Sequence, residues 1–390
     1  MITVAEALSE LFALVQPLEV ETVPLTQANG RILVRDVSAT RDQPPFAASA
    51  MDGYAVKAAS VSPGQSFTVI GEAAAGHRWD GTVGPTQALR IFTGAPLPDG
   101  TDHVIIQENV SREGDIITLD DSANDKSHVR PAGADFKAGD VIKAPRVLAP
   151  SEIALLAAMN IPSVPVTRQP VVAIIATGDE LVQPGELPGD DQIIASNSYG
   201  LAALLHNIGA QPRLLPIARD TINSLELAFD LAADADLIIT IGGASVGDHD
   251  LVGQVAQSKG MDRSFYKVAM RPGKPLMAGR MGQAAMIGLP GNPVSAMVCG
   301  HIFVVPMIRK MLGLDEAPAP VETLTLAKDA PANGPREHYM RAHAGDDGVT
   351  IFDRQDSALL TVLADANCLA VRPIADPARK AGDSIDIIRL

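Results

Sequence analysis

The chain has 390 residues, several times the usual domain length of about 100 to 200 residues, so we expect more than one domain. Hydrophobic residues make up 46% and charged residues 20% of it, which excludes a disordered or low-complexity chain. The net charge of −15, with no run of Lys or Arg, excludes a general nucleic-acid binder, because phosphate backbones would be repelled.

The cysteines and the hydrophobic runs indicate the compartment. Cys299 and Cys368 belong to no C-x-x-C motif or Cys/His cluster, so we expect neither a disulfide framework nor a zinc site, and a reducing, cytoplasmic location fits best. Residues 1–15 lack the basic leader of a signal peptide, and we find no run of about 18 apolar residues, so neither secretion nor a membrane span is expected.

In chain order, the first expected element is an amphipathic helix at residues 1–15, whose apolar residues follow a helical period. Short alternating segments with turn signals follow between about Asp42 and Arg130 and predict a small β domain. A helix is expected after Pro150, with Ser151 as its N-cap. Because helical or extended segments lie on both sides of the β region, we interpret that region as an insertion.

From Pro170 to about Gly313 the pattern alternates between strands and helices. Strands are expected at 171–176, 213–218, 236–241, 265–270 and 284–289, and helices at 198–207, 221–233, 250–259 and 293–312. Apolar strands of this kind are buried on both faces of a mostly parallel sheet, so a doubly wound α/β domain is predicted. After a linker at 314–320, short alternating segments predict a small C-terminal β barrel or sandwich.

These elements predict a multidomain α/β plus β architecture. The expected domains are a discontinuous linking and dimerisation domain (1–42 and 131–169), the inserted β domain (43–130), the α/β domain (170–313) and the C-terminal β-barrel domain (314–390).

The loops that follow the α/β strands hold the candidate site, because ligands of an open α/β sheet bind beyond the carboxyl ends of its strands. These loops are Thr177-Gly178-Asp179-Glu180, Arg219-Asp220, Gly242 to Asp250, Arg271-Pro272-Gly273-Lys274-Pro275 and Pro290-Gly291-Asn292-Pro293-Val294-Ser295. Glycine-rich turns let backbone N–H groups approach an anion, and a following helix N-terminus adds partial positive charge. An isolated Gly-Gly pair would be read as a tight turn, so the convergence of the loops is what predicts a seat for a phosphate or an oxyanion.

The same loops predict a metal site. They carry four carboxylates: Glu180, Asp220, Asp248 and Asp250. Gathered in a small volume these groups would repel one another, and Mg²⁺, which prefers oxygen ligands, would neutralise them. The opposing cations are Lys267, Arg271 and Lys274. Each aspartate taken singly could instead cap a helix, and capping and metal ligation can coexist at a helix start.

Residues 243–247 also match the G-x-S-x-G pattern of serine hydrolases, with Ser245 as the nucleophile. That motif needs a helix directly after the serine, and here a further acidic loop follows. His301 lies inside an apolar helix. We therefore reject a nucleophilic Ser245 and interpret His301 as an ordinary core or surface histidine.

At these loops the sequence resembles the molybdopterin molybdenumtransferase family of the MoeA type, to which the C-terminal domain of gephyrin also belongs. The resemblance is carried, in order along nearly the whole chain, by Pro44-Pro45-Phe46, SAMDGYA (49–55), GEAAAG (71–76), IFTGAPLP (91–98), RPAGADF (130–136) and the loops above. Such an ordered series is very hard to reach by chance. It implies an elongated four-domain homodimer whose α/β domain is related to the pterin-binding proteins of the MogA type.

The resemblance also implies a reaction. The family takes adenylylated molybdopterin and molybdate, cleaves the pyrophosphate-like linkage, and yields molybdenum cofactor and AMP with a divalent cation, usually Mg²⁺. Glycine-rich loops and cations suit the phosphates and the oxyanion, and the carboxylates suit the metal. The upstream adenylyltransferase and acceptor molybdoenzymes are further candidate partners.

Carried over by position, the resemblance implies roles for individual residues. Asp52, Thr93 and Asp135 would complete the site of the partner subunit across a homodimer. The other expected catalytic residues are Glu180, Asp220, Asp250, Lys267 and Lys274, and the expected metal ligands are Glu180, Asp220, Asp248 and Asp250. The expected substrate-binding residues are Gly242, Gly243, Ser245, Gly247, Arg271, Pro272, Gly273, Pro290, Gly291, Asn292, Ser295, Arg336 and Ser357, with Arg336 and Ser357 as the molybdate candidates.

The chain departs from the family pattern at two places. Arg271 stands where the family often has Lys, so a planar fork replaces a point charge. The stretch from Gly334 to Arg341 resembles the family's G-R-x-x-F-x-R, with Pro335 inserted and Tyr339 in place of Phe.

Two alternatives stay open beside the transferase. A non-catalytic scaffold or receptor-binding module of the gephyrin type is disfavoured by the intact set of charged loop residues. A molybdopterin adenylyltransferase of the MogA type would carry a Thr-rich TGGTG-like loop, whereas this chain reads GGASVGDHD at 242–250.

Overall fold

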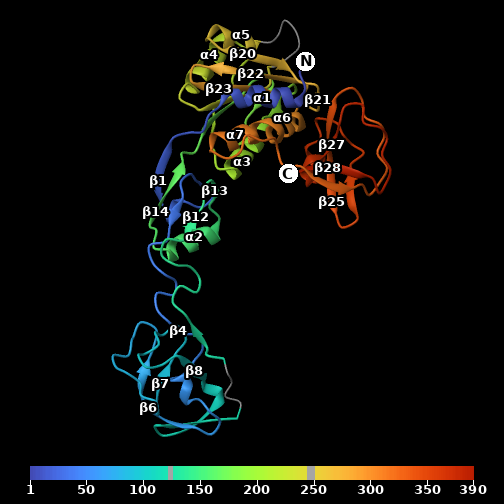
Figure 1. The fold of residues 1–390 in the computed structure, drawn as a ribbon. Coiled ribbons are helices and arrows are strands. Elements are labelled where there is room, and N and C mark those ends of the chain that lie inside the picture. Colours follow the sequence, from blue (N-terminus) through green and yellow to red (C-terminus); the bar gives the residue numbers. More distant parts are fainter. Residues whose placement is uncertain (122–125, 244–250) are drawn as a thin grey trace.

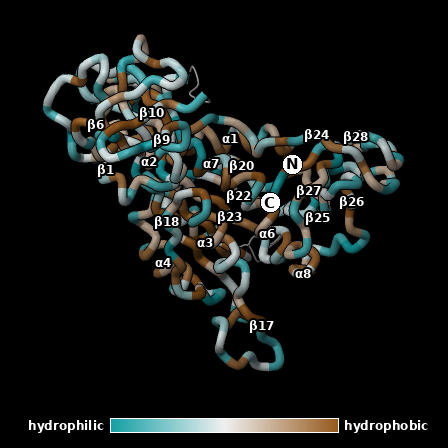
Figure 2. The backbone as a smooth tube through the Cα atoms, turned by 90° about the horizontal axis from the view of Figure 1, so that it is seen from below, coloured by the Kyte–Doolittle hydropathy of each residue, from teal (hydrophilic) through white to brown (hydrophobic). Residues whose placement is uncertain are grey.

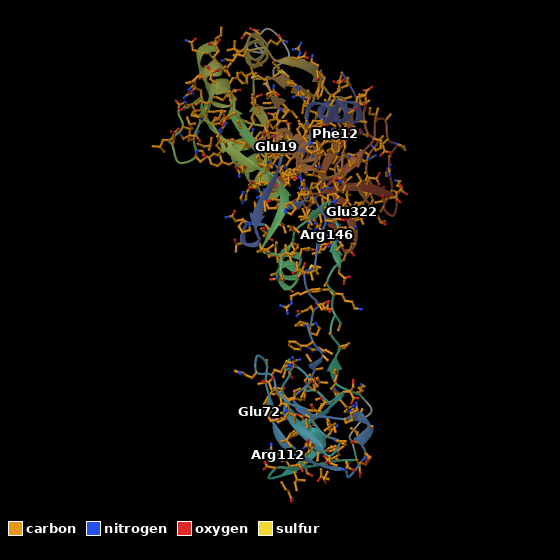
Figure 3. All side chains as sticks on the ribbon, turned by 60° about the vertical axis from the view of Figure 1, so that its left-hand side comes forward. Phe12, Glu19, Glu72, Arg112, Arg146 and Glu322 are labelled. Atoms are coloured by element: carbon orange, nitrogen blue, oxygen red, sulfur yellow. The ribbon has the colours of Figure 1, made fainter. Side chains whose placement is uncertain are left out.

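A computed structural model of the chain describes residues 1–121, 126–243 and 251–390. The molecule is elongated (Figure 1), with the α/β domain and the C-terminal β domain side by side at one end and a separate β domain at the other. In Figure 3, Glu72 and Arg112 of that distal β domain lie far from Phe12, and a thin pair of chain segments joins the distal β domain to the rest of the molecule.

The α/β domain is built on a six-stranded sheet of order β18-β15-β19-β23-β22-β20. Its strands are β15 (Val171–Ala176), β18 (Gln211–Leu214), β19 (Leu237–Ile241), β20 (Asp262–Lys267), β22 (Pro275–Met281) and β23 (Ala284–Leu289). β18, β15, β19 and β23 are parallel, and β22 is antiparallel to both of its neighbours, so β20 again follows the common direction. The predicted mostly parallel sheet is confirmed, and every strand except β22 ends at the same edge.

Helices cover both faces of this sheet. They are α3 (Asn197–Asn207), α4 (Ile222–Leu231), α5 (Leu251–Ser258), α6 (Pro293–Cys299) and α7 (Val305–Met311). One apolar cluster joins the sheet to α3, α6 and α7, and a second joins it to α4 and α5. β19 and β23 are buried at every position, as expected for central strands covered on both faces.

The N-terminal helix α1 (Val4–Leu14) belongs to this core as well. A capping box between Thr3 and Glu6 starts it, and its buried stripe includes Val4, Leu8 and Leu11. The stripe packs into the first α/β cluster. The helix that we grouped by sequence with the linking domain therefore lies on the α/β domain.

Several predicted boundaries were wrong. The strand expected at 213–218 is β18, which ends at Leu214, and Ala218 keeps only an isolated bridge to Thr177. The strand expected at 265–270 is two elements, because β20 stops at Lys267 and β21 (Met270–Arg271) pairs with the C-terminal sheet. β22 was missed, since Pro275 and Gly279 weaken its strand signal.

The helix after Pro150 also begins two residues earlier than predicted. α2 (Pro150–Ala158) has Ala149 as its N-cap residue and Pro150 in its first turn, so Ser151 is not the cap. Proline fits the first helical position because its missing N–H would be unpaired there in any case.

The long C-terminal helix of the α/β domain is continuous from Pro293 to Met311, with a π-helical turn at Gly300–Val304 between α6 and α7. By length and composition alone this helix could cross a membrane. The sequence was expected to contain no such stretch. However, 72% of the most apolar window of this helix is buried inside the protein, as in a core helix.

The linking domain has a four-stranded sheet of order β1-β14-β2-β13, and it packs against α2. Its strands, with the β3–β12 pair, are β1 (Val20–Pro24), β2 (Ile32–Leu33), β3 (Val37–Ser38), β12 (Val141–Ile142), β13 (Arg146–Val147) and β14 (Ser163–Thr167). The chain leaves this domain after β3 and returns at β12, so the distal β domain is inserted into it.

The distal β domain has a six-stranded sheet of order β8-β5-β7-β6-β10-β9. Its strands, with the β4–β11 pair at the neck, are β4 (Ala48–Ser49), β5 (Gly53–Val56), β6 (Ser66–Ala73), β7 (Gln87–Ile91), β8 (His103–Ile106), β9 (Val110–Glu113), β10 (Ile116–Leu119) and β11 (Val129–Arg130).

The C-terminal domain is a strongly curved sheet. Its elements are β24 (Glu322–Thr325), β25 (Glu337–Gly345), β26 (Gly348–Ile351), α8 (Leu360–Ala364), β27 (Cys368–Arg372) and β28 (Ser384–Arg389). The order β21-β25-β27-β28-β24, with β26 beside β25, is completed by a bridge from Leu326 to Val349 that joins β24 back to β26. This curvature agrees with the predicted barrel.

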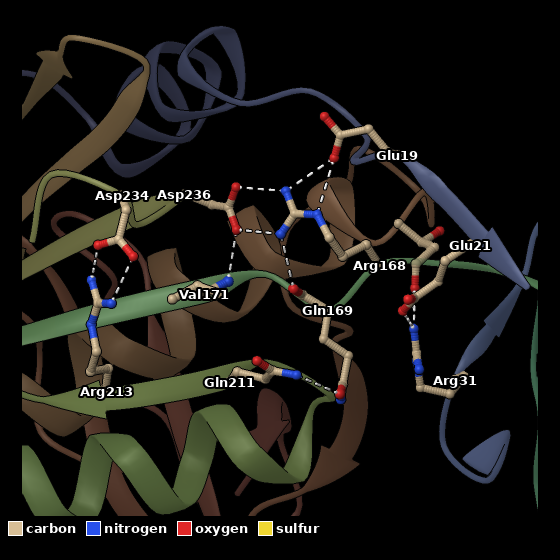
Figure 4. A network of polar contacts seen from close by, with 11 residues as sticks. Glu19, Glu21, Arg31, Arg168, Gln169, Val171, Gln211, Arg213, Asp234 and Asp236 are labelled. Carbon is tan, nitrogen blue, oxygen red and sulfur yellow. Dashed lines mark hydrogen bonds and ion pairs between the residues drawn. The ribbon is translucent and has the colours of Figure 1, made fainter. Parts of the chain in front are cut away.

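A polar network holds the linking domain to the α/β domain (Figure 4). The Arg168 guanidinium donates two hydrogen bonds of 2.8 Å to Asp236 and also bonds Glu19. Asp236 accepts a further bond of 2.8 Å from the Val171 N–H at the start of β15. Although burial opposes it, these donors lower the pKa of Asp236.

We expect Asp236→Asn to reduce the free energy of unfolding by about 2 kcal/mol at neutral pH, because charge-assisted hydrogen bonds are lost. The folded-state pKa lies below the unfolded value of about 3.9, so this stabilisation is present above that pH and is lost as pH falls through the folded pKa. Denaturant unfolding at several pH values tests this. The exposed Asp234, paired with Arg213, is the control: Asp234→Asn should leave stability unchanged, and equal losses in both variants would contradict the prediction.

Candidate functional site

A cavity of about 600 Å³ lies at the edge where the α/β strands end. The residues singled out by sequence that line it are Glu180, Asp220, Gly242, Gly243, Pro290, Gly291 and Asn292. They come from loops after β15, β18, β19 and β23, so the convergence expected from the sheet direction is found.

Two glycines let the backbone form the floor of this cavity. Gly242 and Gly243 have φ of +92° and +65°, and a Cβ on Gly243 would lie 2.2 Å from Val252 Cγ2. Only glycine adopts this turn without strain and with the helix α5 packed so close. The side chain of Asn197, at the start of α3, donates a 2.7 Å hydrogen bond to the Gly291 carbonyl and fixes the neighbouring loop.

The carboxylates at one end of the cavity repel one another. The pKa of Asp220 is raised, first by partial burial and then by the negative charges of Asp179 and Glu180. Asp220 does not cap α4, because Thr221 is the N-cap and its hydroxyl accepts from Ser224 N. A cation here would relieve this repulsion, and the oxygen-only donor set is the one that Mg²⁺ prefers.

The four expected metal ligands, Glu180, Asp220, Asp248 and Asp250, are not all among the residues that the structure describes. Within residues 1–121, 126–243 and 251–390, no group of three or more His, Cys, Asp and Glu side chains is arranged to hold a metal ion. The predicted residues Ser245, Gly247, Asp248 and Asp250 lie outside the described residues.

A basic cluster lies where the α/β domain meets the C-terminal sheet. β21 pairs with β25 so that Arg271 is opposite His338. Arg341, further along β25, is fully buried, and its Nε and Nη1 have no hydrogen-bond partner among the described residues. His338 Nε2 is likewise buried without a partner in the described chain. Buried donors left unpaired are costly, so this cluster has the character of an anion site.

Burial and the mutual repulsion of the positive charges in the cluster lower the pKa values of His338 and Arg341. Burial, and then the positive charges of Arg271, Arg341, Arg336 and Arg372, lower the pKa of His338 to about 4. Burial and Arg271 also lower the pKa of Arg341. Arg372 differs from these arginines, since it forms an ion pair with Asp376.

Ser357 connects the cavity to the basic cluster. Asn292 Nδ2 donates a 3.1 Å hydrogen bond to Ser357 Oγ, and Val294 N donates one to the Ser357 carbonyl. From the other side, Arg341 Nη2 bonds the Asp356 carbonyl at 2.9 Å. The loop that carries Ser357 is thus held by both domains, and the adjacent Ala358 lines the cavity.

Other predicted residues lie around these two features without lining the cavity. Lys274 is exposed beside the cavity residue Pro275, and Lys267 ends β20 with its ammonium 5.3 Å from the Tyr266 ring centroid. Arg336 bonds the Met270 carbonyl, next to Arg271. The remaining predicted residues, Pro272, Gly273 and Ser295, are buried supports.

Asp52, Thr93 and Asp135 are not brought to this cavity by their own chain. Asp52 Oδ1 accepts hydrogen bonds of 2.8 and 2.7 Å from the backbone N–H and hydroxyl of Thr93, and these bonds lower the pKa of Asp52. This pair lies on the distal β domain, and Asp135 lies on the segment leading away from that domain, far from the α/β sheet (Figure 1).

Sequence reasoning missed several residues of the site. Asp179 perturbs Asp220, and the cavity wall includes Leu181 and the segment from Ile193 to Ser198. Asp179 belongs to the loop Thr177-Gly178-Asp179-Glu180, so the sequence could have placed it among the carboxylates expected at the metal site. His338 and Arg341 stood in a quoted motif, but nothing in the sequence says that they are buried and unpaired.

The fold and the site define a class: a multidomain protein whose α/β domain has a glycine-floored cavity at the carboxyl edge of its sheet, beside a basic cluster shared with the C-terminal domain. Residues 173–310 match the family described as probable molybdopterin binding domain, residues 2–160 match the MoeA N-terminal region (domain I and II), and residues 323–390 match the MoeA C-terminal region (domain IV). The chain belongs to the molybdopterin molybdenumtransferase family.

Whole-length relatives agree with this assignment. Proteins named molybdopterin molybdenumtransferase from Nostoc sp. and Haemophilus influenzae are 38% and 34% identical, over 100% and 99% of this chain and 94% and 98% of their own. A solved structure of molybdopterin biosynthesis MoeA protein from Pyrococcus horikoshii OT3 covers 100% of both chains at 26% identity with a TM-score of 0.83.

Proposed function

We propose that this protein inserts molybdate into adenylylated molybdopterin and releases AMP, in the biosynthesis of the molybdenum cofactor. The observation that carries the proposal is the buried Arg341, two of whose nitrogens have no partner among the described residues, with its basic neighbours next to a glycine-floored cavity. One substrate is an oxyanion and the other carries a pyrophosphate-like linkage, so the two features fit the two substrates.

In this proposal, different loops along the carboxyl edge of the sheet bind the phosphates, molybdate and Mg²⁺. Gly242, Gly243 and Gly291 receive the linked phosphates, and Arg271, Arg336 and Arg341, with Ser357, hold molybdate beside them. Glu180 and Asp220, with Asp248 and Asp250, would hold Mg²⁺, which supplies charge neutralisation for the phosphates when bound. Lys267 and Lys274 contribute positive charge at the rim, where the leaving phosphate carries its negative charge.

Both alternatives are less well supported. A pure scaffold has no use for a fully buried arginine whose Nε and Nη1 have no partner among the described residues, because buried donors left unpaired cost stability. An adenylyltransferase would not need the C-terminal basic cluster, because no oxyanion is inserted in that step. The full-length relatives named as molybdenumtransferases favour the transferase over both.

We also propose that the protein works as a cytoplasmic homodimer of the four domains predicted from the sequence. Asp52 and Thr93 adjoin β5 and β7 of the distal β domain, which lies at the opposite end of the molecule from the α/β domain (Figure 1), so they can serve such a site only if it belongs to a second copy. Asp135 would act from the flank of the same β domain. The upstream adenylyltransferase and acceptor molybdoenzymes are the proposed further partners.

The direct test supplies purified protein with adenylylated molybdopterin, molybdate and Mg²⁺ and follows AMP by chromatography. We expect AMP release that depends on molybdate, together with cofactor that activates an apo-molybdoenzyme. Absence of AMP with intact substrate would contradict the proposed function.

Mixing two inactive variants tests the shared site. We expect Asp52→Ala and Asp220→Asn to be inactive alone, and an equal mixture, refolded together, to regain about a quarter of wild-type AMP release, because half of the dimers then contain one intact site. Two copies of either single variant treated in the same way are the control. No recovery from a mixture that does form mixed dimers would place Asp52 outside the site.

A further inference from the structure

The cavity has an apolar wall that the proposed function does not yet use. β16 (Leu181–Val182) and β17 (Ile193–Ile194) are paired in parallel, with Leu181 beside Ile193 and Val182 beside Ile194. Leu181, Ile193 and Ile194 line the cavity, whereas Val182 is buried and does not line it. Since paired residues in a sheet share a face, Leu181 and Ile193 form one continuous apolar surface towards the cavity.

This surface is open to solvent although it is apolar. Ile193 is 58% exposed. Its position is nevertheless fixed, because Ile193 N donates a 2.7 Å hydrogen bond to the Glu180 carbonyl and Ala195 N donates one to the Val182 carbonyl. The loop between the two strands, residues 183–192, is called the excursion. It projects from the α/β domain (Figure 2), and the Tyr199 hydroxyl holds it by donating a hydrogen bond to the Gln183 side chain. An ordered, exposed apolar wall inside a cavity that also carries carboxylates and backbone polar groups suits a flat ring.

The order of the strands indicates which part of the proposed substrate, adenylylated molybdopterin, would reach this wall. Along the carboxyl edge, β18 and β15 carry Asp220 and Glu180, β19 and β23 carry the glycine loops, and β20 leads to Arg271. With adjacent strands about 4.8 Å apart, β15 and β20 are separated by about 19 Å. The cavity and the basic cluster beside it therefore form a row: the cluster at one end, the glycine loops in the middle, and the carboxylates with the apolar wall at the other end.

Resting on the proposed function, we propose that the adenine of the adenylylated substrate packs on the wall formed by Leu181 and Ile193. Molybdate must meet the dithiolene sulfurs, so the pterin half lies towards the basic end. The phosphates occupy the glycine loops, and the nucleoside continues to the opposite end of the row. Packing on an apolar wall uses the flat face that every base has.

Calorimetric titration of the full chain with AMP, ribose 5-phosphate and neopterin tests this. We expect wild type to bind AMP more tightly than ribose 5-phosphate. Ile193→Ser should weaken AMP binding about tenfold, because most of the apolar contact of one side chain is lost. Binding of ribose 5-phosphate and of neopterin should not change, and Ile193→Phe should restore AMP binding.

Leu187→Ser is the matched control. Leu187 lies on the same excursion, is 97% exposed and does not line the cavity, so its loss should leave all three affinities unchanged. An equal loss for ribose 5-phosphate, a loss confined to neopterin, or wild type that binds AMP no better than ribose 5-phosphate overturns the proposal. AMP release by wild type in the transferase assay is scored separately, so failure of the adenine site and failure of the proposed function are distinguishable.

Discussion

Replacement of Asp220 by Asn is expected to lower molybdate-dependent AMP release about a hundredfold or more, as losses of metal-site groups do. Asp220 lies at the carboxylate end of the cavity, where Asp179 and Glu180 raise its pKa. The Asn variant removes one negative charge that a cation would otherwise bind. Initial rates at several Mg²⁺ concentrations measure the effect, and the Mg²⁺ concentration for half-maximal rate should rise.

The fold should not suffer from this change. A carboxyl whose pKa is raised in the folded state is destabilising when ionised, so Asp220→Asn should unfold at the same temperature as wild type or a higher one. Asp190→Asn, on the exposed excursion, removes the same charge and should keep full activity. Undiminished AMP release by the Asp220 variant would remove this residue from the site.

Arg341→Met should separate anion binding from stability. Loss of a buried cation that bonds an oxyanion is expected to weaken molybdate binding about ten- to a hundredfold. In wild type, molybdate should raise the unfolding temperature by binding the folded state alone, and this gain should be much smaller in the variant. Thermal unfolding with and without molybdate gives both quantities.

Without molybdate the same variant should be as stable as wild type or more stable. The guanidinium is fully buried, and two of its nitrogens have no partner in the described chain, so an apolar side chain of similar length removes an uncompensated charge. Arg389→Met, at an exposed pair with Glu322, should change neither property. A variant that is strongly destabilised yet still gains stability from molybdate would assign Arg341 a structural role.

Much of this architecture could be predicted because its signals are local. Glycine loops follow buried strands, and in a parallel sheet this alone places Gly242, Gly291 and Glu180 at one edge. Turn signals and alternation likewise marked the distal β domain. The strand at 275–281 was missed because Pro275 and Gly279 weaken its signal, and its pairing as an antiparallel strand depends on its neighbours in the sheet.

The rest of the site depends on distant pairing that sequence does not encode locally. Arg341 and His338 became recognisable as an anion site only once they were seen to be buried beside Arg271, which comes from another domain. The wall of Leu181 and Ile193 depends on a two-residue parallel pairing, for which the sequence has no alternation to read. The hydrogen bonds between Asp52 and Thr93, and the distance of their domain from the α/β domain (Figure 1), appear only in the folded chain.

Because the two-residue strand β21 pairs with the C-terminal domain, the basic cluster forms only after that domain has folded. The residues of β21 belong to the α/β part of the chain, yet they form the outer strand of the C-terminal sheet beside β25. Arg271 therefore gains His338, Arg336 and Arg341 as neighbours only when the last domain has been made and docked. In the proposed function, a nascent chain that ends before residue 336 would have the glycine loops and carboxylates proposed for the pterin substrate but would lack Arg336, Arg341 and Ser357, which are proposed to hold molybdate.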